Sequence, residues 1–482
     1  MPFIPPDRIE HSYEAIIIGS GFGSMFFLQE FLKRPRTGRI LIVEWGGYRS
    51  HDWQVENKAN SILETEQLYT RDPGERSWHY SIGFGGGTNC WWAQCPRNHP
   101  NDFRLKTKYG VGLDWPLSYE DLVPYYHEAE QTMLIAGPDD LAVHYPGSGR
   151  YAQPPHRMND IDRIMKSAQP DMHFVMPNGR LSRSIGSRSA CCGTADCRWC
   201  PVDAKFTALN SMQNVIEHSD VDICVDSKVV FIDVQNNVAR GIRFLNGGKE
   251  YSVRADLVIL GANGIHSPIL LQQSGFNHSL IGKYLHEKIE CAVEVFLDGV
   301  DNFGGSTITT GMNLSILDGD HRSKYGSALL LFENNWAAFG MRPEHGRWRQ
   351  VLPMTIIVET LPQETSTVTL ASDGRGHVSF PKQSEYGLNG VQAAIDKLPK
   401  ILGPLPVERI QVRHIDKISV HLQGTLRMGT DPAQSVVDAG QIHHDVRNLV
   451  VVGSSVFPTA GSAPPSLTVA ALSLRAAHLL SS

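Results

Sequence analysis

The chain has 482 residues, of which 41 % are hydrophobic and 20 % charged, and its formal net charge is −6. This length predicts two domains with a large core, and the weakly acidic balance excludes an electrostatic nucleic-acid binder. No uninterrupted apolar run approaches the roughly 18 residues of a membrane helix, so we expect no transmembrane segment. The segment Met1–Pro6 lacks the basic end and apolar centre of a signal peptide. We therefore expect a cytoplasmic protein, or a periplasmic one only if a partner that carries the signal is exported with it.

The N-terminal stretch predicts a β-α-β unit that binds a dinucleotide. The apolar run Ala15–Ile18 indicates a buried strand, and it leads directly into the glycine-rich segment Gly19–Ser24. A helix is expected at Ser24–Lys33. A second buried strand, Arg39–Val43, ends in Glu44, about 25 residues beyond the first glycine. A dinucleotide fold places the carboxylate that accepts the ribose hydroxyls at this distance.

The glycines of this loop allow a pyrophosphate to lie on bare backbone N–H groups at the positive end of the helix. Gly19 permits the tight turn, and Gly21 permits the close approach of the phosphate. The third motif position holds Ser24, with Gly23 one place earlier, which is a mild departure. Because the motif lies so close to the N-terminus, it indicates FAD as a permanent cofactor more than NAD.

A second glycine-rich segment, Gly83–Asn89, indicates a loop that lies against a ligand. It has four glycines in its first five positions, too many for the interior of a stable helix or strand. A plain surface turn is the alternative, but Trp91 and Trp92 beside it would be costly to expose. Between the two glycine segments, Asn57–Tyr69 is predicted to be helical.

Further helices and strands follow from capping residues and periodicity. Ser118 and Asp121 have the spacing of a capping box that opens a helix through Glu130, residues 136–184 are loop-rich, and Ala204–His218 predicts a helix. Alternating patterns predict short strands with a turn at Asn246–Gly248. The strands are Ile223–Val225, Val229–Asp233, Ala239–Phe244 and Glu250–Val253.

The strand-then-glycine pattern of the opening motif recurs at Leu257–Leu260 and at Leu449–Val452. Three buried strands from the start, middle and end of the chain imply one sheet assembled from distant segments. Ser267-Pro268 is expected to start a helix, with proline in the first turn, and Ser466–Leu480 is expected to form an apolar helix. Strand-like runs such as Leu329–Phe332 and Met354–Thr360 indicate a separate, substrate-side sheet.

Four of the eight cysteines lie within ten residues, at Cys191, Cys192, Cys197 and Cys200. Thiolates at this spacing can converge on one centre, and a proline after the last cysteine recurs in ferredoxin-like loops. An iron–sulfur cluster is the favoured interpretation, with structural zinc, a disulfide or redox pair, and free thiols as alternatives. All four are the expected ligands, with three of the four as the alternative, because the adjacent Cys191 and Cys192 can hardly both face one metal in ideal geometry. The remaining cysteines are interpreted as reduced packing residues; they are Cys90, Cys95, Cys224 and Cys291.

Over nearly its whole length the chain resembles the glucose–methanol–choline (GMC) oxidoreductases. It is most similar to the branch with the flavin subunits of fructose, glucose and gluconate dehydrogenases and with pyranose oxidases. The stretches that carry the resemblance are Gly19–Gly21, Gly86–Thr88 with Trp92-Ala93, Pro100–Phe103, Asp114–Pro116, Ser267-Pro268, His421–Gly429, and Asn448–Val451 through Phe457–Thr459 to Ser466–Thr468.

The resemblance implies an α/β (α+β overall) protein with two domains. A Rossmann-like FAD-binding domain is expected to be assembled from residues 1–110, 185–290 and 411–482. A substrate-binding domain with a mainly antiparallel sheet is expected from residues 111–184 and 291–410.

The resemblance also implies that a hydroxyl group is oxidised by hydride transfer to flavin N5, with His421 as the base that takes the hydroxyl proton. Imidazole suits this role because its pKa lies near neutrality. The family has a second Asn or His near the flavin, where this sequence has Pro464 and Pro465. This departure puts the usual two-residue alcohol clamp in question. The residues that could replace it are Ser462, Ser466, His443 and His444.

The FAD-binding residues expected from the glycine motifs and the resemblance come from every part of the FAD domain. They are Gly19, Gly21, Phe22, Gly23, Glu44, Gly86, Gly87, Thr88, Asn89, Val229, Ala262, Gly453, Ser454, Ser466, Leu467 and Thr468. Pyranose oxidases attach the flavin to a histidine where this chain has Trp91. The flavin is therefore expected to be non-covalent, with a thioether to Cys90 as the alternative.

The combined expectation is a dehydrogenase that acts on a sugar, glycoside or polyol. Its electrons would leave through the cysteine-bound centre to a partner, with a small helper subunit and a cytochrome as candidates. The related sugar dehydrogenases have a similar iron–sulfur-like stretch, but with one more residue before the last cysteine. The alternatives are an oxidase that makes hydrogen peroxide, and a flavoprotein without oxidase or dehydrogenase activity, acting as a lyase or an electron-carrier subunit.

Overall fold

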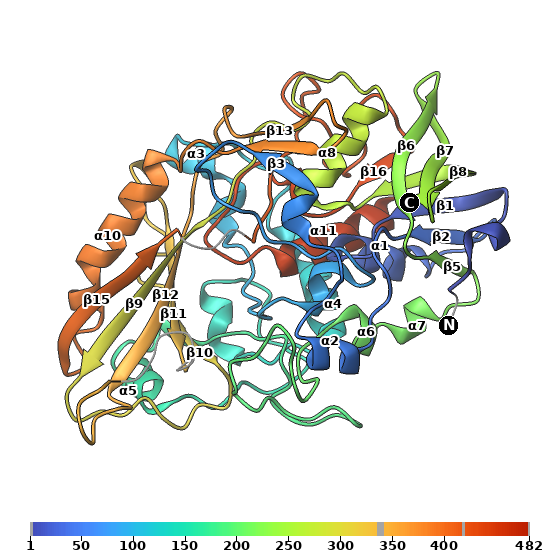
Figure 1. Cartoon of the computed structure of the whole chain (residues 1–482). Coiled ribbons are helices and arrows are strands. Elements are labelled where there is room, and N and C mark those ends of the chain that lie inside the picture. The colour runs from blue at the N-terminus through green and yellow to red at the C-terminus, as the bar shows by residue number, and fades with distance from the viewer. Residues whose placement is uncertain (1–2, 335–341, 417–419, 481–482) are drawn as a thin grey trace.

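The computed structural model describes residues 3–334, 342–416 and 420–480 (Figure 1). Met1 and Pro2, on which part of the expectation about targeting rests, lie outside these ranges. Two large sheets form the body of the molecule, and the helix α10 (Glu385–Ile401) runs along the outer side of one of them. This mixed α/β architecture confirms the predicted fold class. Within the described ranges, no helix has both the length and the apolar character to span a membrane.

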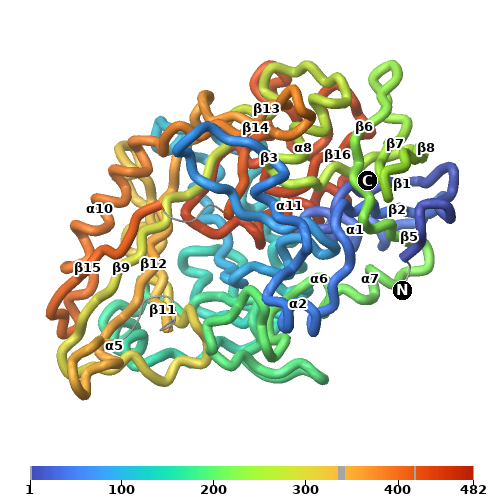
Figure 2. Tube along the Cα trace, in the orientation of Figure 1, coloured from blue at the N-terminus to red at the C-terminus, as the bar shows by residue number. Residues whose placement is uncertain are grey.

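The first sheet has seven strands, in the order β5-β2-β1-β8-β7-β6, with β16 also paired to β8. Its strands are β1 (Ser12–Ile18), β2 (Ile40–Val43), β5 (Val221–Cys224), β6 (Lys228–Gln235), β7 (Val238–Asn246), β8 (Lys249–Leu260) and β16 (Leu449–Val451). The strands β5, β2, β1, β8 and β16 are parallel neighbours, whereas β6, β7 and the start of β8 form an antiparallel meander. Figure 2 shows by colour that segments from the start, middle and end of the chain meet in this sheet. The prediction of one sheet assembled from three distant strands is confirmed.

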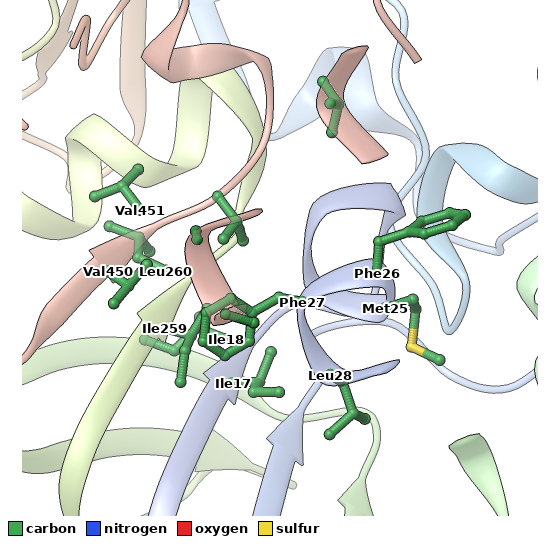
Figure 3. Close-up of a cluster of buried hydrophobic side chains, with 14 of the residues drawn as sticks. Ile17, Ile18, Met25, Phe26, Phe27, Leu28, Ile259, Leu260, Val450 and Val451 are labelled. Atoms are coloured by element: carbon green, nitrogen blue, oxygen red, sulfur yellow. The ribbon is translucent and has the colours of Figure 1, made fainter. Parts of the chain in front are cut away.

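The parallel strands are buried on both faces, which explains their continuous apolar runs. The helix α1 (Phe22–Phe31) lies between this sheet and the C-terminal helix α11 (Ser466–Leu479), so its Met25, Phe26 and Phe27 are all fully buried. Figure 3 shows the Phe27 side chain directed toward those of β1, β8 and β16, with Met25 and Phe26 on the other side of α1. The first turn of α1 is thereby fixed against the carboxyl ends of the parallel strands.

The second sheet has six strands in the order β15-β9-β12-β11-β10-β4, all paired antiparallel. Its strands are β4 (His173–Val175), β9 (Ile289–Leu297), β10 (Thr309–Asn313), β11 (Ala328–Glu333), β12 (Val351–Val358) and β15 (Val407–Ile415). This is the separate antiparallel sheet that the sequence predicts. A small third sheet is formed by β3 (Tyr69–Arg71), β13 (Thr367–Leu370) and β14 (Gly376–Ser379).

The remaining helices are mostly short. They are α2 (His51–Asn57), α3 (Leu105–Tyr109), α4 (Val123–Thr132), α5 (Asp160–Ala168), α6 (Ala208–Ser211), α7 (Gln213–Ile216) and α8 (Asn263–Gln273). Single 3-10 turns lie at Pro6–Arg8, Thr65–Gln67, Gly86–Asn89, Pro100–Phe103, Glu120–Leu122, Asp139–Val143, Asp320–Ser323 and Ser454–Val456.

The predicted capping box before α4 is present. The Ser118 N–H donates to Asp121 Oδ2 at 2.8 Å, and the Asp121 N–H donates to Ser118 Oγ at 3.2 Å. The prediction of a helix at Asn57–Tyr69 is wrong. Here α2 precedes that stretch, because Ser50 caps its start and Lys58 ends it in a left-handed conformation with φ of 48°.

Two further boundaries differ from the sequence prediction. The helix expected at Ala204–His218 is two short helices, since Thr207 caps α6 and the chain turns at Met212 before α7. The strands expected at Glu250–Val253 and Leu257–Leu260 are one continuous strand, β8.

The prediction that Ser267-Pro268 starts a helix is also wrong. Helix α8 begins earlier, where Asn263 Oδ1 accepts the N–H of Ile265 at 2.8 Å, and Pro268 lies inside the helix. Proline has no N–H for the carbonyl of Gly264, four residues earlier. The hydroxyl of Thr425 donates to that carbonyl instead, at 2.8 Å, and so compensates the missing helical bond.

Candidate functional site

A cavity of about 860 Å³ is lined by residues of both large sheets. The glycine loops and strand ends of the first sheet border one part of it, and the inner face of the second sheet borders another. This volume lies within the range of about 300–1,000 Å³ that is typical of ligand and cofactor sites.

At the first sheet, the N-terminus of α1 opens onto the cavity. Gly21 is the N-cap of α1, and a Cβ atom added to it would meet no atom within 4 Å. A Cβ atom on Gly86 would lie 3.0 Å from Gly21 Cα, so the two glycine-rich loops touch each other. The bare N–H groups and the helix dipole make this corner suitable for a pyrophosphate.

Packing explains why the third glycine position of the motif holds Ser24, with Gly23 one place earlier. A Cβ atom on Gly23 would lie 2.7 Å from the Gly453 nitrogen, so Gly23 is the residue that permits close contact between α1 and the end of β16. Ser24 faces Gly261, where any Cβ atom would overlap the Ser24 hydroxyl. The serine is accommodated because its neighbour, the first residue after β8, is a glycine.

Glu44 lies at the end of β2 and lines the same cavity. Its Oε2 accepts the Ser20 N–H at 3.0 Å and the Ser20 hydroxyl at 2.7 Å, and its Oε1 accepts the Gly46 N–H at 3.0 Å. Burial raises the pKa of Glu44, and these hydrogen bonds oppose that shift. The carboxylate is therefore held rigidly where a ribose diol can donate to it.

A group of aromatic and basic side chains near Glu44 was not predicted. Lys228 Nζ lies 4.3 Å above the ring centre of Trp45, whose ring meets His266 edge to face at 5.1 Å. The Tyr80 hydroxyl is 2.9 Å from His266 Nε2, and burial lowers the pKa of His266 to about 3. All four residues line the cavity. They come from separate segments, and no sequence spacing could have linked them.

His421 also lines the cavity, and it contacts Glu287. Its Nδ1 lies 3.0 Å from Glu287 Oε1, while Glu287 Oε2 accepts the N–H groups of Val420 and His421 at 2.8 and 2.7 Å. Burial opposes ionisation of Glu287, but the charge and hydrogen bonds of His421 lower its pKa below the usual value. An ionised Glu287 holds the imidazole proton on Nδ1, which leaves Nε2 with a free lone pair.

The loop after His421 is fixed to the end of the C-terminal strand. The Gly424 N–H donates to the Ser454 carbonyl at 3.2 Å, and the Ser454 hydroxyl donates to the Leu422 carbonyl at 2.7 Å. Gly424 has φ of 89°, and a side chain there would overlap the ring of His286. The His-x-x-Gly-Thr pattern therefore fixes the position of His421 relative to the β16 loop.

The two prolines that replace the family's second Asn or His lie in the cavity wall. Pro464, Pro465 and the adjacent Ser466 all line the cavity. The suggested substitutes are mostly elsewhere. Ser462 does not line the cavity; His443 Nδ1 accepts the Asp445 N–H at 3.1 Å, and His444 Nε2 lies 2.8 Å from Ser435 Oγ. Of the four candidates, only Ser466 faces the cavity.

Most of the predicted FAD-binding residues line the cavity together with His421. These are Gly19, Gly21, Phe22, Gly23, Glu44, Gly86, Gly87, Val229, Ala262, Gly453, Ser454 and Ser466. Four do not: Thr88, Asn89, Leu467 and Thr468. The two threonine hydroxyls form hydrogen bonds within the protein. Thr88 Oγ1 donates to the Gly85 carbonyl at 2.7 Å, and Thr468 Oγ1 lies 2.8 Å from the Tyr126 hydroxyl.

Cys90 and Trp91 also line the cavity. The Trp91 indole N–H donates to the Phe206 carbonyl at 2.8 Å, and its ring packs edge to face on Phe22 at 4.7 Å. Burial raises the pKa of the Cys90 thiol. A non-covalent flavin stays the prediction.

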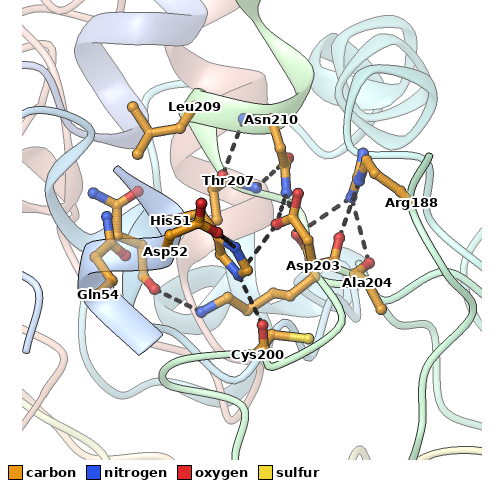
Figure 4. A network of polar contacts seen from close by, with 12 residues as sticks. His51, Asp52, Gln54, Arg188, Cys200, Asp203, Ala204, Thr207, Leu209 and Asn210 are labelled. Atoms are coloured by element: carbon orange, nitrogen blue, oxygen red, sulfur yellow. Dashed lines mark hydrogen bonds and ion pairs between the residues drawn. The ribbon is translucent and has the colours of Figure 1, made fainter. Parts of the chain in front are cut away.

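The four clustered cysteines differ in their contacts. Cys197 Sγ accepts a hydrogen bond from Arg180 Nη1 at 3.3 Å, and Cys191 Sγ lies 3.5 Å from Thr307 Oγ1. The Cys192 side chain is exposed. Figure 4 shows the carbonyl of Cys200 held by the His51 ring, at 2.8 Å.

Across residues 3–334, 342–416 and 420–480, no group of three or more His, Cys, Asp or Glu could hold a metal ion, and the cysteines there are free. The expected ligand set Cys191, Cys192, Cys197 and Cys200 is therefore not assembled in this structure, and the expectation of an iron–sulfur cluster or zinc gains no support.

Two models of the GMC oxidoreductase family match this chain, one over residues 165–290 and one over residues 385–473. It is 26 % identical to the fructose dehydrogenase large subunit of Gluconobacter japonicus, over 97 % of this chain and 98 % of that protein. It is 25 % identical to 2-methyl-1,2-propanediol dehydrogenase of Mycolicibacterium austroafricanum (97 % and 95 % covered). It is also 25 % identical to 6'''-hydroxyparomomycin C oxidase of Streptomyces lividus (99 % and 93 % covered).

Solved structures share the fold. Pyridoxine 4-oxidase from Mesorbium loti superposes with a TM-score of 0.68 at 16 % identity, covering 97 % of this chain and 99 % of that one. Formate oxidase of Aspergillus oryzae RIB40, in an R554K variant, gives a TM-score of 0.66 at 16 % identity, with 97 % and 98 % covered.

Proposed function

Because the chain belongs to the GMC oxidoreductase family, we propose that it is an FAD-dependent dehydrogenase that oxidises a hydroxyl group of a sugar, glycoside or polyol to a carbonyl. One observation carries this proposal. A single cavity is lined both by the dinucleotide loop with Glu44 and by His421, whose Nδ1 contacts Glu287.

The residues present fit FAD. The open N-terminus of α1 at Gly21 would take the pyrophosphate, Glu44 would accept the ribose hydroxyls, and the end of β16 at Gly453 would border the ring system. When bound, FAD supplies the hydride acceptor that alcohol oxidation requires. The chain supplies the binding groups and the base.

His421 is the base in this proposal. Its Nε2 takes the proton of the substrate hydroxyl, which makes the adjacent carbon a better hydride donor. The carboxylate of Glu287 fixes the ring tautomer and stabilises the imidazolium that forms. Because Pro464 and Pro465 occupy the second family position, His421 acts without a second side chain from that position.

The names of the relatives support the substrate class. They act on fructose, on a propanediol and on a hydroxylated paromomycin, all of which carry several hydroxyl groups. We propose that the electrons pass to a partner or an external acceptor, as the dehydrogenases among the relatives suggest; an oxygen-using oxidase is the alternative, because the relatives also include an oxidase. The large-subunit name of one relative supports a further, smaller subunit as a partner. We also propose a cytochrome as a partner, and a cytoplasmic location unless a partner exports the chain.

The test uses the flavin-loaded protein and a panel of polyols without oxygen. Bleaching of the flavin absorbance by at least one polyol is expected, and no bleaching by any of them would refute the proposal. Re-oxidation is then measured in air and with an artificial one-electron acceptor. Fast re-oxidation by the acceptor with slow peroxide formation supports a dehydrogenase, whereas rapid stoichiometric peroxide would assign the chain as an oxidase.

A further inference from the structure

The face of the second sheet that borders the cavity carries two carboxyl groups. In the register of the sheet, Glu290 on β9 lies opposite Ile357 on β12, and Thr355 on β12 lies opposite Leu331 on β11. Directly paired residues, and residues two apart along a strand, point to the same face. Glu290, Thr355 and Glu333 therefore share one face, and all three line the cavity.

The opposite face of this sheet is a closed apolar core. Ile289 and Cys291, on either side of Glu290, pack with Phe332, which precedes Glu333, and with Val391 of α10. A shift of one residue in either strand would bury the carboxyls in this core, so their placement toward the cavity is strongly specified.

Most buried carboxylates in this chain have a cationic partner or several donors. Glu130 pairs with Arg97 at 2.7 Å, and Glu359 pairs with Arg322 at 2.7 Å. Glu44 has no cation, but it accepts three hydrogen bonds from the Ser20 and Gly46 groups.

Glu290 and Glu333 are compensated far less. Glu333 accepts the Thr309 hydroxyl at 2.8 Å and the Gln94 amide at 3.4 Å, and it forms no ion pair with a described residue. The carboxyl of Glu290 forms neither a hydrogen bond nor an ion pair with any residue that the structure describes. Burial raises the pKa of each to about 7. Glu333 is buried and Glu290 is half-buried at the cavity wall. Carboxyls with so few partners are costly there, so a ligand that supplies donors would be bound favourably.

We propose that Glu290 and Glu333 bind hydroxyl groups of the substrate other than the one that is oxidised, and so select a polyhydroxylated molecule. This inference rests on the proposed function. Hydroxyl groups suit the site because they donate and accept, and so can bond to a carboxyl in either protonation state. The neutral groups beside the two carboxyls, the Thr355 hydroxyl and the Gln94 amide, also suit hydroxyls.

The experiment measures anaerobic flavin bleaching by a sugar or polyol and by a monohydric alcohol, over a range of concentrations. The variants are Glu290→Gln and Glu333→Gln, which keep the shape of the side chain. Glu294→Gln is the matched control, because Glu294 lies on the same strand β9, faces Arg413 at 3.7 Å and does not line the cavity. Flavin content and melting temperature are recorded for each protein to show that it is folded.

At pH 8, above the pKa of about 7 of both carboxyls, each cavity variant is expected to raise the apparent Kd for the polyol about 10-fold or more, corresponding to loss of a hydrogen bond to a charged group. The preference for polyol over monohydric alcohol should fall by a similar factor, while Glu294→Gln resembles the wild type. An unchanged preference in both cavity variants would overturn the inference. A loss confined to substrates with an amino group would also overturn it, because the carboxyls would then bind a cation.

The wild-type protein separates this inference from the proposed function. If no alcohol bleaches the wild-type flavin, the proposed function itself fails. If a polyol bleaches it but the two cavity variants bind that polyol normally, only the assignment of Glu290 and Glu333 fails.

Discussion

Nδ1 of His421 lies 3.0 Å from Oε1 of Glu287, and the other oxygen of Glu287 accepts the backbone N–H of the same histidine at 2.7 Å. One carboxylate thus orients both the ring and the backbone of the proposed base. The pair is separated by 134 residues in the sequence.

The first prediction concerns the base. Replacing His421 by Ala should slow the limiting rate of flavin bleaching by about 10²–10⁴-fold, the usual contribution of a positioned general base. The flavin content should stay normal, because His421 is not among the groups that hold the pyrophosphate or the ribose. An unchanged bleaching rate with every polyol would show that another group takes the proton.

Glu287→Gln tests the positioning role. The amide can accept hydrogen bonds through only one oxygen, so the ring and the two N–H groups lose part of their support. We expect the limiting bleaching rate to fall about 10-fold or more, with a smaller change in the apparent Kd for the polyol. Glu287→Asp, which keeps the charge, should recover part of the rate. Equal changes in rate and Kd in both variants would indicate general disruption of the site.

Two glycines of the first loop should give different phenotypes when changed to alanine. At Gly21 the added methyl group enters open space beside the cavity, so Gly21→Ala should preserve the fold but weaken FAD binding. At Gly23 the methyl group would lie 2.7 Å from the Gly453 nitrogen, so Gly23→Ala should lower the melting temperature of the apo-protein as well. FAD titration and thermal melts of both apo-variants check this. Normal FAD affinity in Gly21→Ala would contradict the assigned pyrophosphate site.

Thr425→Val should destabilise the fold by weakening helix α8, although Thr425 is not part of that helix. The valine leaves the Gly264 carbonyl without the hydroxyl that compensates Pro268. An unsatisfied buried carbonyl costs about 1–3 kcal/mol, which urea unfolding can measure. Pro268→Ala restores an N–H to that carbonyl, so the double variant should lose less stability than the sum of the two single variants. Simple additivity would show that the hydroxyl has another role.

The pH dependence of stability should report Glu333. Burial raises its folded-state pKa to about 7 from an ordinary value of 4.5, so the folded protein binds the extra proton between these values. The contribution of Glu333 to the free energy of unfolding is therefore present at low pH and is lost as the pH rises through about 7. Glu333→Gln should raise the melting temperature at pH 8 but hardly at pH 5.

Glu408 provides a control of opposite sign. Hydrogen bonds from Arg347 and Arg342 lower its pKa, so Glu408→Gln should be neutral or destabilising at pH 8. If Glu333→Gln shifts the melting temperature equally at both pH values, the carboxyl is not held neutral in the folded protein.

Features that depend on local pattern could be predicted from the order of the residues alone. The run Ala15–Ile18 and the glycines after it specified the β-α-β unit, because a buried parallel strand and a phosphate loop each impose residue types on neighbouring positions. The apolar strands ending at Leu260 and Val452 extended this to one sheet. Local pattern failed where a cap or turn decided the outcome, as at Lys58 and Pro268.

The set of side chains that meet in the cavity follows from the packing of distant segments and could not be predicted from local pattern. Glu287 reaches His421, and Thr425 reaches Gly264, through contacts that no spacing encodes. The direction of Glu290 and Glu333 toward the cavity follows from the register of the second sheet, which is fixed by burial of its opposite face. The physical reason is that a strand pattern shows which residues share a face, whereas the packing of that face against a core or a cavity is set by distant parts of the chain.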